Sequence, residues 1–250
     1  MPTYGDVAQF MEKIAPSSTA MQWDNVGLLI GSAHTEVTGC MVALDVTLDV
    51  LEAAEMEQAN LIITHHPVIF QPLYSIPGDG RIAHLLQSGI GVLSAHTNLD
   101  LAEGGVNHAL CSALGLPSGK PFANPDGVGR IVPLPKPYIV SAFAALVKRS
   151  LGAGCVKYCM GENPLQTIAV VSGAGGEYWK SAQELGASAL LTGEVKHHEW
   201  VDALNMRFPI ISAGHFDTEA VVLEPLSRQL AMAFPTIPMH ICKIWRVESL

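Results

Sequence analysis

Histidines and carboxylates occur at a few points of this sequence, each just after a short apolar run. They are His65 and His66 after LIIT, His96 and Asp100 after IGVLSA, and His215 and Glu219 after PIISA. Imidazole together with carboxylate is the mixture of ligands that proteins use for zinc, manganese or iron. These positions therefore suggest a metal site.

The adjacent histidines favour two metal ions over one. Neighbouring side chains leave an extended backbone in opposite directions, so one ion could not easily bind both His65 and His66, although Pro67 could bend the chain. Two ions about 3.5–4 Å apart would take one histidine each. His215 and Glu219 are four residues apart, so a helix that begins near His215 would place both side chains on one face.

Carboxylates would complete such a dinuclear centre. Asp100 and Glu219 each offer two oxygens, and we expect them to bridge the ions. The remaining positive charge favours hydroxide or an anionic ligand such as phosphate, and it lowers the pKa of bound water to near neutrality. His96 would lie beside this water as an acid, a base or a hydrogen-bonding group. The expected chemistry is attack by metal-bound hydroxide on an anionic substrate.

The segment EVKHHEW, residues 194–200, holds weaker candidates. Its pattern is typical of a helix, so His197 and His198 would point to different sides. We expect both at the surface or in a pocket wall rather than on a metal ion. Glu194 and Lys196 could contact a substrate or could be solvated charges.

The elements that position these residues alternate between strand and helix. The apolar runs predict strands at 40–44, 61–64 and 90–95, and the intervening patterns predict helices at 45–59, 82–89 and 105–116. This order is typical of an α/β fold with a largely parallel sheet and helices on its faces. Ligands of such sheets bind beyond the carboxyl ends of the strands, where the histidines occur.

The second half of the chain repeats the first in the same order. TIAVVSG (167–173) resembles CMVALDV (40–46), ALLTGEVKHHEW (189–200) resembles LIITHHPVIF (61–70), and FPIISAGHFDTE (208–219) resembles IGVLSAHTNLD (90–100). We therefore predict two related α/β lobes, residues 1–125 and 126–250, whose join lies in the proline- and glycine-rich segment 121–138. The C-terminal segment could return to the first lobe. GAGG (173–176) lacks the spacing of a phosphate loop and indicates a tight turn.

Composition narrows the class of protein. Hydrophobic residues make up 49% of the 250 and charged residues 15%, which is typical of a compact globular protein. The net charge of −9, with no run of Lys or Arg, argues against nucleic acid as a partner. Five cysteines without a CxxC spacing argue against a disulfide framework, and no apolar run is long enough for a membrane span. We expect a cytoplasmic protein.

Five motifs resemble the GTP cyclohydrolase 1 type 2 homologue family, also known as YbgI-like dinuclear metal proteins. They are WDNVGLLIG (23–31), LIITHHP (61–67), AHTNLDLAEGGVN (95–107), LTGEVKHHE (191–199) and GHFDTE (214–219). The resemblance spans nearly the whole chain. It implies two interlocked lobes with a dinuclear metal site between them and a toroidal homohexamer. The ligands that it implies are His65, His66, Asp100, His215 and Glu219, with His96 close to the metals.

Two positions depart from the family pattern. Phe216-Asp217 stands where an aromatic residue and alanine are common, and Glu194 stands where aspartate is common. Asp217 adds a carboxylate that could alter metal preference. Neither change removes a ligand. Two divalent ions per chain could be zinc, iron, manganese or cobalt, because this set of donors suits all four.

The leading functional interpretation is a metal-dependent hydrolase that resembles GTP cyclohydrolase and acts on a nucleotide or another small anionic substrate. One alternative is a non-enzymatic protein that handles metal, as a chaperone or a sensor. Another is a regulatory protein that binds a partner and uses the metals for structure. Readily exchanged metal would favour the metal-handling role, and turnover that is lost with the ligands would favour the hydrolase.

Overall fold

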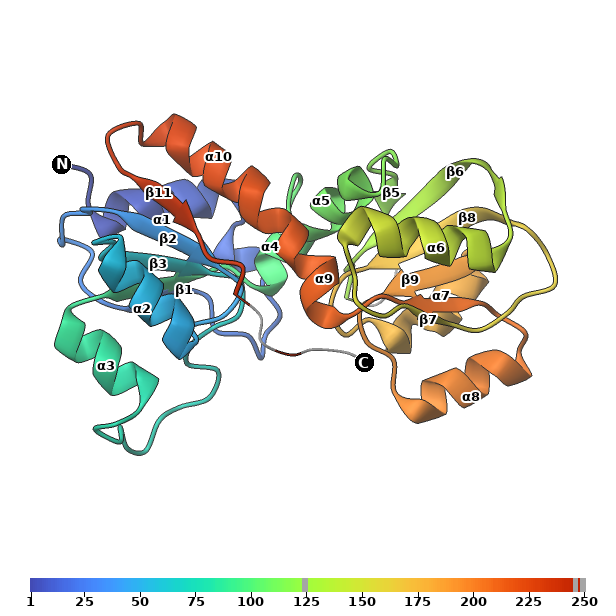
Figure 1. Ribbon diagram of the computed structural model, residues 1–250, viewed down its shortest axis with the longest axis horizontal. Helices are drawn as coiled ribbons and strands as arrows, with labels where there is room; N and C mark the ends of the chain where they lie inside the picture. Colours follow the sequence, from blue (N-terminus) through green and yellow to red (C-terminus); the bar gives the residue numbers. More distant parts are fainter. Residues whose placement is uncertain (123–125, 245–246, 248–250) are drawn as a thin grey trace. The chain divides into compact units, whose positions relative to one another are not determined.

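The computed structural model describes residues 1–122, 126–244 and 247. The chain forms two compact units (Figure 1). The first holds Met1–Gly105 and, from the far end of the sequence, residues 223–244; the second holds Val106–Val222. Each unit contains a sheet with helices on both faces, as expected for an α/β fold.

The sheet of the first unit has the order β1-β4-β3-β2-β11. Its strands are β1 (Gly27–Ile30), β2 (Cys40–Ala43), β3 (Leu61–Thr64), β4 (Gly91–Ser94) and β11 (Met239–Ile241). All neighbouring pairs are parallel except β1 with β4. The pairing of β11 with β2 brings the end of the described chain back to the first unit.

Helices cover both faces of this sheet, which explains why β2, β3 and β4 are buried along their whole length. They are α1 (Tyr4–Ile14), α2 (Leu48–Met56), α3 (Arg81–Ser88), the short α4 (Thr97–Leu101) and α10 (Leu223–Ala233), with a 3-10 turn, η1 (Ser17–Thr19). Phe10 of α1 packs on Phe234, just after α10, with ring centroids 5.5 Å apart. Helices α2 and α3 lie on the opposite face (Figure 1).

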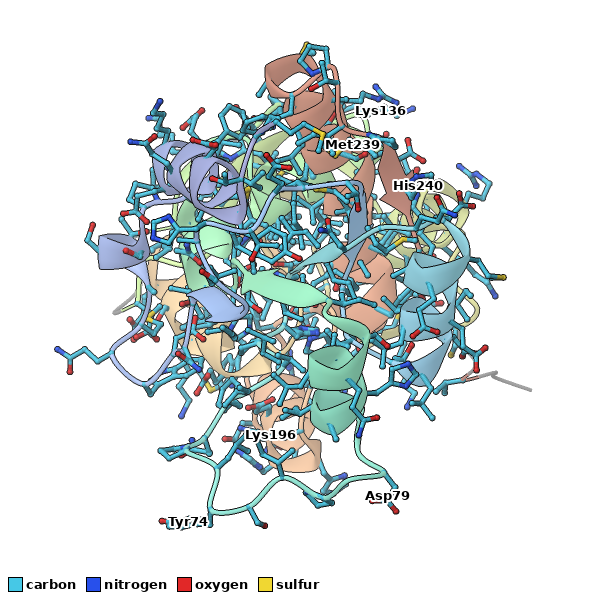
Figure 2. All side chains as sticks on the ribbon, turned by 90° about the vertical axis from the view of Figure 1, so that its left-hand side faces the viewer. Tyr74, Asp79, Lys136, Lys196, Met239 and His240 are labelled. Carbon is cyan, nitrogen blue, oxygen red and sulfur yellow. The ribbon has the colours of Figure 1, made fainter. Side chains whose placement is uncertain are left out.

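A long segment without regular structure joins β3 to α3 in the first unit. It begins at His65 and carries exposed apolar side chains, among them Leu73 and Tyr74. Figure 2 shows Tyr74 and Asp79 at its periphery. Because its first residues are the predicted metal ligands, this segment belongs to the candidate site as much as to the connection.

The six-stranded sheet of the second unit has the order β5-β6-β8-β9-β10-β7. Its strands are β5 (Lys120–Pro121), β6 (Arg130–Tyr138), β7 (Lys157–Tyr158), β8 (Leu165–Val171), β9 (Ala189–Thr192) and β10 (Ile210–Ser212). Only β8, β9 and β10 are parallel, and the other strands pair antiparallel at the two edges. The second sheet is therefore mixed, whereas the first is largely parallel.

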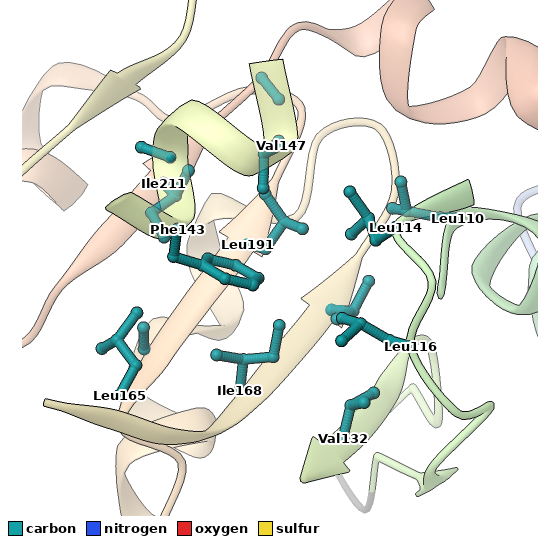
Figure 3. Packing of buried hydrophobic residues seen from close by; sticks show 14 of the residues in the cluster. Leu110, Leu114, Leu116, Val132, Phe143, Val147, Leu165, Ile168, Leu191 and Ile211 are labelled. Carbon is teal, nitrogen blue, oxygen red and sulfur yellow. The ribbon is translucent and has the colours of Figure 1, made fainter. Parts of the chain in front are cut away.

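The helices of the second unit pack on both faces of its sheet. They are α5 (Val106–Ala113), α6 (Val140–Leu151), α7 (Trp179–Glu184), α8 (His197–Asn205) and α9 (His215–Glu219), with 3-10 turns η2 (Gly176–Tyr178) and η3 (Ala220–Val222). Phe143 and Val147 of α6 lie against Ile168, Leu191 and Ile211 of the parallel strands, and all five are fully buried (Figure 3).

The division into units differs from the predicted lobes, 1–125 and 126–250. Helix α5 was expected in the first lobe, but Leu110 and Cys111 belong to the apolar core of the second unit. The segment 121–138, expected as a join, holds the whole of β6. Pro133 lies beyond the two residue pairs that β5 makes with β6, and the register with β8 becomes irregular between Pro133 and Tyr138, which is where prolines are tolerated in a sheet.

The strand registers define the internal repeat more sharply than the sequence does. Ala43, Thr64 and Ser94 are aligned across β2, β3 and β4. In the second unit Val171, Thr192 and Ser212 are aligned in the same way. The counterparts of His65 and His66 are therefore residues 193 and 194, Gly-Glu, rather than the later pair 197–198. The predicted match between the two histidine pairs was wrong, because the second pair lies in α8.

No helix among the described residues is long and apolar enough to span a lipid bilayer.

Candidate metal centre

His65 and His66 extend the ends of the parallel strands in the first unit. The amide of His65 donates to the carbonyl of Ala43 at 3.3 Å, and that of His66 donates to Leu44 at 2.9 Å. The two rings are 5.0 Å apart between centroids, with a 45° angle between their planes. Of the two arrangements considered from the sequence, opposite directions or a bend near Pro67, the structure has the bend: the chain bends at His65 and His66.

Each of these imidazoles is oriented through its Nδ1 atom. His65 Nδ1 lies 3.0 Å from the carbonyl oxygen of Ala95, and His66 Nδ1 lies 2.9 Å from Asp45 Oδ1. Both partners only accept, so the proton of the neutral ring is on Nδ1 and the lone pair is on Nε2. This arrangement is typical of histidines that bind metals, because the outer oxygen fixes the tautomer and the ring direction.

His96 completes a group of three imidazoles. Its ring centroid lies 5.1 Å from that of His65 and 5.5 Å from that of His66. One ligand atom from each ring lies within 4.8 Å of the others, so the three could hold a metal ion. The prediction placed His96 beside the ions as an acid or base, and its position in this group is compatible with either role.

Asp24 holds His96 in the same manner. Asp24 Oδ1 lies 2.9 Å from His96 Nδ1, and its other oxygen accepts from the backbone and the hydroxyl of Thr97 at 3.0 and 2.5 Å. Burial alone would raise the pKa of the Asp24 carboxyl, but these hydrogen bonds outweigh it and lower the pKa to about 2. The Asp24 carboxylate is therefore ionised at neutral pH.

The rest of the WDNVGLLIG segment also has a place at this site. Asn25 Nδ2 donates to the carbonyl of Ile69 at 2.6 Å, which ties the segment to the loop after His66. The Trp23 ring lies 5.6 Å from that of Phe70 and 6.0 Å from that of His96. Trp23 does not lie in the core, because 57% of it is exposed. It forms an aromatic border to the imidazole group instead.

Asp100 comes from α4, the short helix that follows His96. Its Oδ1 atom lies 3.7 Å from His65 Nε2. This carboxylate is on the side of His65 that does not contact Ala95. The first unit thus brings together four of the predicted site residues: His65, His66, His96 and Asp100.

The second unit brings together the other two. His215 and Glu219 occupy the first and last positions of α9, and His215 Nε2 lies 3.1 Å from Glu219 Oε2. The predicted i, i+4 arrangement on one helical face is therefore confirmed. Glu194 Oε2 lies 3.3 Å from His215 Nδ1, so Glu194 orients this ring as Asp24 orients His96. Gly214, with φ of +94°, makes the turn from β10 into α9.

Gly173 is packed against this pair. It has φ of +60°, and a Cβ atom built on it would lie 2.2 Å from Glu219 Oε1 and 3.3 Å from His215 Nε2. Its amide donates to Thr218 Oγ1 at 3.1 Å. The GAGG segment is thus a tight turn, as predicted, and its first glycine leaves room for the Glu219 carboxylate.

Asp217 does not join this donor set. It lies two residues from both His215 and Glu219, about 200° around the helix from each. Its oxygen lies near Gly214, 3.0 Å from where a Cβ of that residue would be. Burial raises the pKa of the Asp217 carboxyl. The expectation that Asp217 adds a carboxylate near the metals is not supported by its position on α9.

Four further histidines have surroundings other than the imidazole group. His84 Nε2 lies 2.7 Å from Glu55, and His240 Nδ1 lies 3.2 Å from Glu57, both in the first unit. His197 and His198 are exposed at the start of α8, as predicted. Asp45 was not predicted from the sequence, although it is the second residue after β2 as His66 is the second after β3, and that position was a usable signal.

The donors fit divalent ions of the transition series. Imidazole Nε2 atoms and carboxylate oxygens converge within each unit, and each site histidine has an oxygen partner at Nδ1. Among known protein families, the model of the Duf34/NIF3 (NGG1p interacting factor 3) family matches residues 2–246.

The chain belongs to the DUF34/NIF3 family. A curated relative from Clostridium perfringens, named GTP cyclohydrolase 1 type 2 homolog, is 35% identical over 235 residues, 90% of each chain. A relative of the same name from Clostridium acetobutylicum is 33% identical over 236 residues, 90% of this chain and 88% of its own.

Solved structures share the fold of this DUF34/NIF3 protein. A Staphylococcus aureus hypothetical protein superposes with a TM-score of 0.92 at 28% identity, over 100% of this chain and 99% of its own. A Bacillus cereus protein related to NIF3 gives a TM-score of 0.93 at 22% identity, over 100% and 99% of the two chains. The resemblance inferred from the five motifs is therefore confirmed at the level of family and fold.

Proposed function

We propose that this protein is a metal-dependent hydrolase with two divalent ions per chain, acting on a nucleotide or another small anionic substrate. The proposed ligands are His65, His66, Asp100, His215 and Glu219. Asp100 and Glu219 are the proposed bridging ligands. The names of the curated relatives support a reaction of the GTP cyclohydrolase type.

One observation carries the proposal. In the first unit, His65, His66 and His96 each have Nδ1 held by an oxygen, while their rings gather within 5.0–5.5 Å of one another. Three neighbouring imidazoles with the same tautomer would not stabilise a protein core, because their protonated forms would repel one another. A set of Nε2 lone pairs pointing to one region is suited to metal binding.

Bound divalent ions would supply two kinds of chemistry here, a lower pKa for water and a positive charge that holds an anionic group. His96 is the proposed acid or base. The ionised Asp24 carboxylate keeps the Nδ1 proton of His96 in place and leaves Nε2 to accept or release a proton. The aromatic rings of Trp23 and Phe70 border His96, with centroids 6.0 and 6.1 Å from that of the imidazole.

Elemental analysis and a turnover assay together test this proposal. We expect about two ions per chain in protein purified without a tag or chelator, and their loss in His65→Ala and Glu219→Ala. Metal-loaded protein is then incubated with GTP and a panel of nucleotides, and products are followed by mass spectrometry. Turnover that disappears in both variants supports the hydrolase. Two exchangeable ions without any turnover would instead favour a metal-handling protein.

We further propose a homohexamer in a reducing compartment such as the cytoplasm. The exposed apolar side chains of the segment after His66, including Phe70, Leu73, Tyr74 and Ile76, support burial between copies. All five cysteines are free, which supports a reducing compartment. Light scattering on the purified protein tests the assembly, with six times the chain mass of 26.6 kDa expected.

A further inference from the structure

A pocket of about 430 Å³ opens in the second unit beside His215. It lies among the β7 strand, the turn after β9 and the first turn of α8. The side chains that line it include a thiol, two ammonium groups, a carboxylate, an indole and an imidazole: Cys155, Lys157, Lys196, Glu194, Trp200 and His215. Its volume is within the range of about 300–1,000 Å³ that is usual for small-molecule sites.

The wall of this pocket is held by buried hydrogen bonds. The amides of Gly193 and Glu194 both donate to the carbonyl of Gly173 at 2.9 Å. The amide of Gly175 donates to the buried Thr192 hydroxyl, also at 2.9 Å. These bonds fix the turns on either side of the opening, so the pocket is preformed rather than made by loose loops.

The charged side chains of the pocket differ in how they contact other groups of the protein. Glu194 contacts the His215 ring, and the buried Glu199 accepts from the backbone amide of Lys196 at 2.7 Å. The Lys196 ammonium lies 3.8 Å from Glu199. In contrast, none of the ion pairs found among residues 1–122 and 126–244 involves Lys157. Two carboxylates and one lysine thus have protein partners, and the Lys157 ammonium remains for a ligand.

We propose that this pocket binds the anionic group of a small organic substrate, with Lys157 as the residue that selects for negative charge. Trp200 supplies an apolar surface for the organic part, and Lys196 adds a second positive charge at the rim. The substrate class is a molecule of nucleotide size that carries a phosphate or carboxylate. The inference rests on the proposed function for its reaction, because His215 in the wall is a proposed metal ligand.

Cys155 gives a readout that needs no turnover. It is exposed in the pocket wall, whereas the other four cysteines are buried. Burial raises the pKa of the Cys40 thiol to about 12 and that of Cys111 to about 11, and it also raises the pKa of Cys159. An aromatic disulfide reagent should therefore modify Cys155 first, and Cys155→Ser should abolish that fast phase. A ligand bound in the pocket should slow the modification of Cys155.

The experiment measures the rate of Cys155 modification in the full-length protein as purified, with inorganic phosphate, GMP and guanosine as probes. We expect GMP and phosphate to protect the thiol and guanosine to protect it far less. In Lys157→Met, the concentration of GMP needed for protection should rise on the order of 10-fold, because a charged hydrogen bond is lost. Lys148→Met, at an exposed lysine on α6, should behave like the parent protein.

Several outcomes would overturn the inference. Equal protection in Lys157→Met and in the parent protein would mean that the anion binds elsewhere, such as on metal ions. Equal protection by guanosine and GMP would mean that the pocket does not select for charge. Protection that follows the expected pattern without turnover of any nucleotide would support this binding site while the proposed hydrolase fails, so the two proposals are separable.

Discussion

His66 Nδ1 lies 2.9 Å from a carboxylate oxygen of Asp45, and each is the second residue after the end of its strand, Asp45 after β2 and His66 after β3. Two adjacent parallel strands thus deliver a histidine and its orienting carboxylate to the same edge of the sheet. The contact keeps the proton on Nδ1 and leaves Nε2 as the ligand atom. The orientation of the ring is therefore a property of the sheet and does not depend on a bound ion.

Replacing Asp45 with Asn should weaken metal binding by about 10–100-fold without unfolding the protein. An amide can turn its NH₂ group toward Nδ1, and the His66 proton would then move to Nε2 and block the lone pair. Isothermal titration of the chelator-treated protein with Zn²⁺ or Co²⁺ measures the change. Asp79→Asn, at an exposed position in the same unit, is the matched control. Unchanged affinity in Asp45→Asn would show that the contact does not set the tautomer.

Gly173→Ala should lower both the affinity for metal and the stability of the fold. The new methyl would lie 2.2 Å from Glu219 Oε1, so the carboxylate must move. Gly152→Ala separates the two effects, because Gly152 has φ of +67° and no atom within 4 Å of its added Cβ. The unfolding free energy of both variants should fall by about 1–2 kcal/mol, because alanine is disfavoured in the left-handed backbone conformation. Thermal unfolding measures that loss, and metal titration should show weaker binding only in Gly173→Ala.

Local pattern was enough to predict the parallel strands and the residues at their ends. Runs such as LIIT are short, apolar and closed by polar residues, and β3 has the predicted bounds of Leu61–Thr64. The helical spacing of His215 and Glu219 was equally local. Features that depend on residues close in the sequence can be predicted, because the regular repeat of a strand or a helix sets where their side chains point.

Features that depend on contacts between residues far apart in the sequence could not be predicted in this way. The prolines of the segment 121–138 indicated a linker, but Pro133, Pro135 and Pro137 lie in strand β6, beyond its short ladder with β5. Helix α5 joins the second core through apolar contacts that no local period specifies. Asp24 and His96 meet across 72 positions, so their contact needed the fold. The exposure of Trp23 also contradicts the usual burial of tryptophan, and it occurs at the candidate site.

Trp23 should report metal binding through its fluorescence. Its ring lies 6.0 Å from that of His96, close enough for a paramagnetic ion at the imidazole group to quench it. Adding Co²⁺ to metal-free protein should lower the emission in proportion to the ions bound, whereas Zn²⁺ should not quench. In Trp23→Phe the Co²⁺ effect should largely vanish. Trp179→Phe, at a buried tryptophan of the second unit, should retain it. Equal quenching in Trp23→Phe would place the ion elsewhere.

Asp24 should make the stability of the metal-free protein depend on pH in the acid range. The pKa of its carboxyl is about 2 in the folded protein, below the ordinary 3.8, since hydrogen bonds from His96 and Thr97 outweigh burial. The unfolded chain therefore takes up the proton first as pH falls. The stabilisation is fully present above pH 4 and is lost as pH falls toward 2, with a magnitude of about 2 kcal/mol. Urea unfolding of the parent protein and Asp24→Asn should show a difference in unfolding free energy that shrinks across this window. A difference that stays constant with pH would contradict the assigned ionisation.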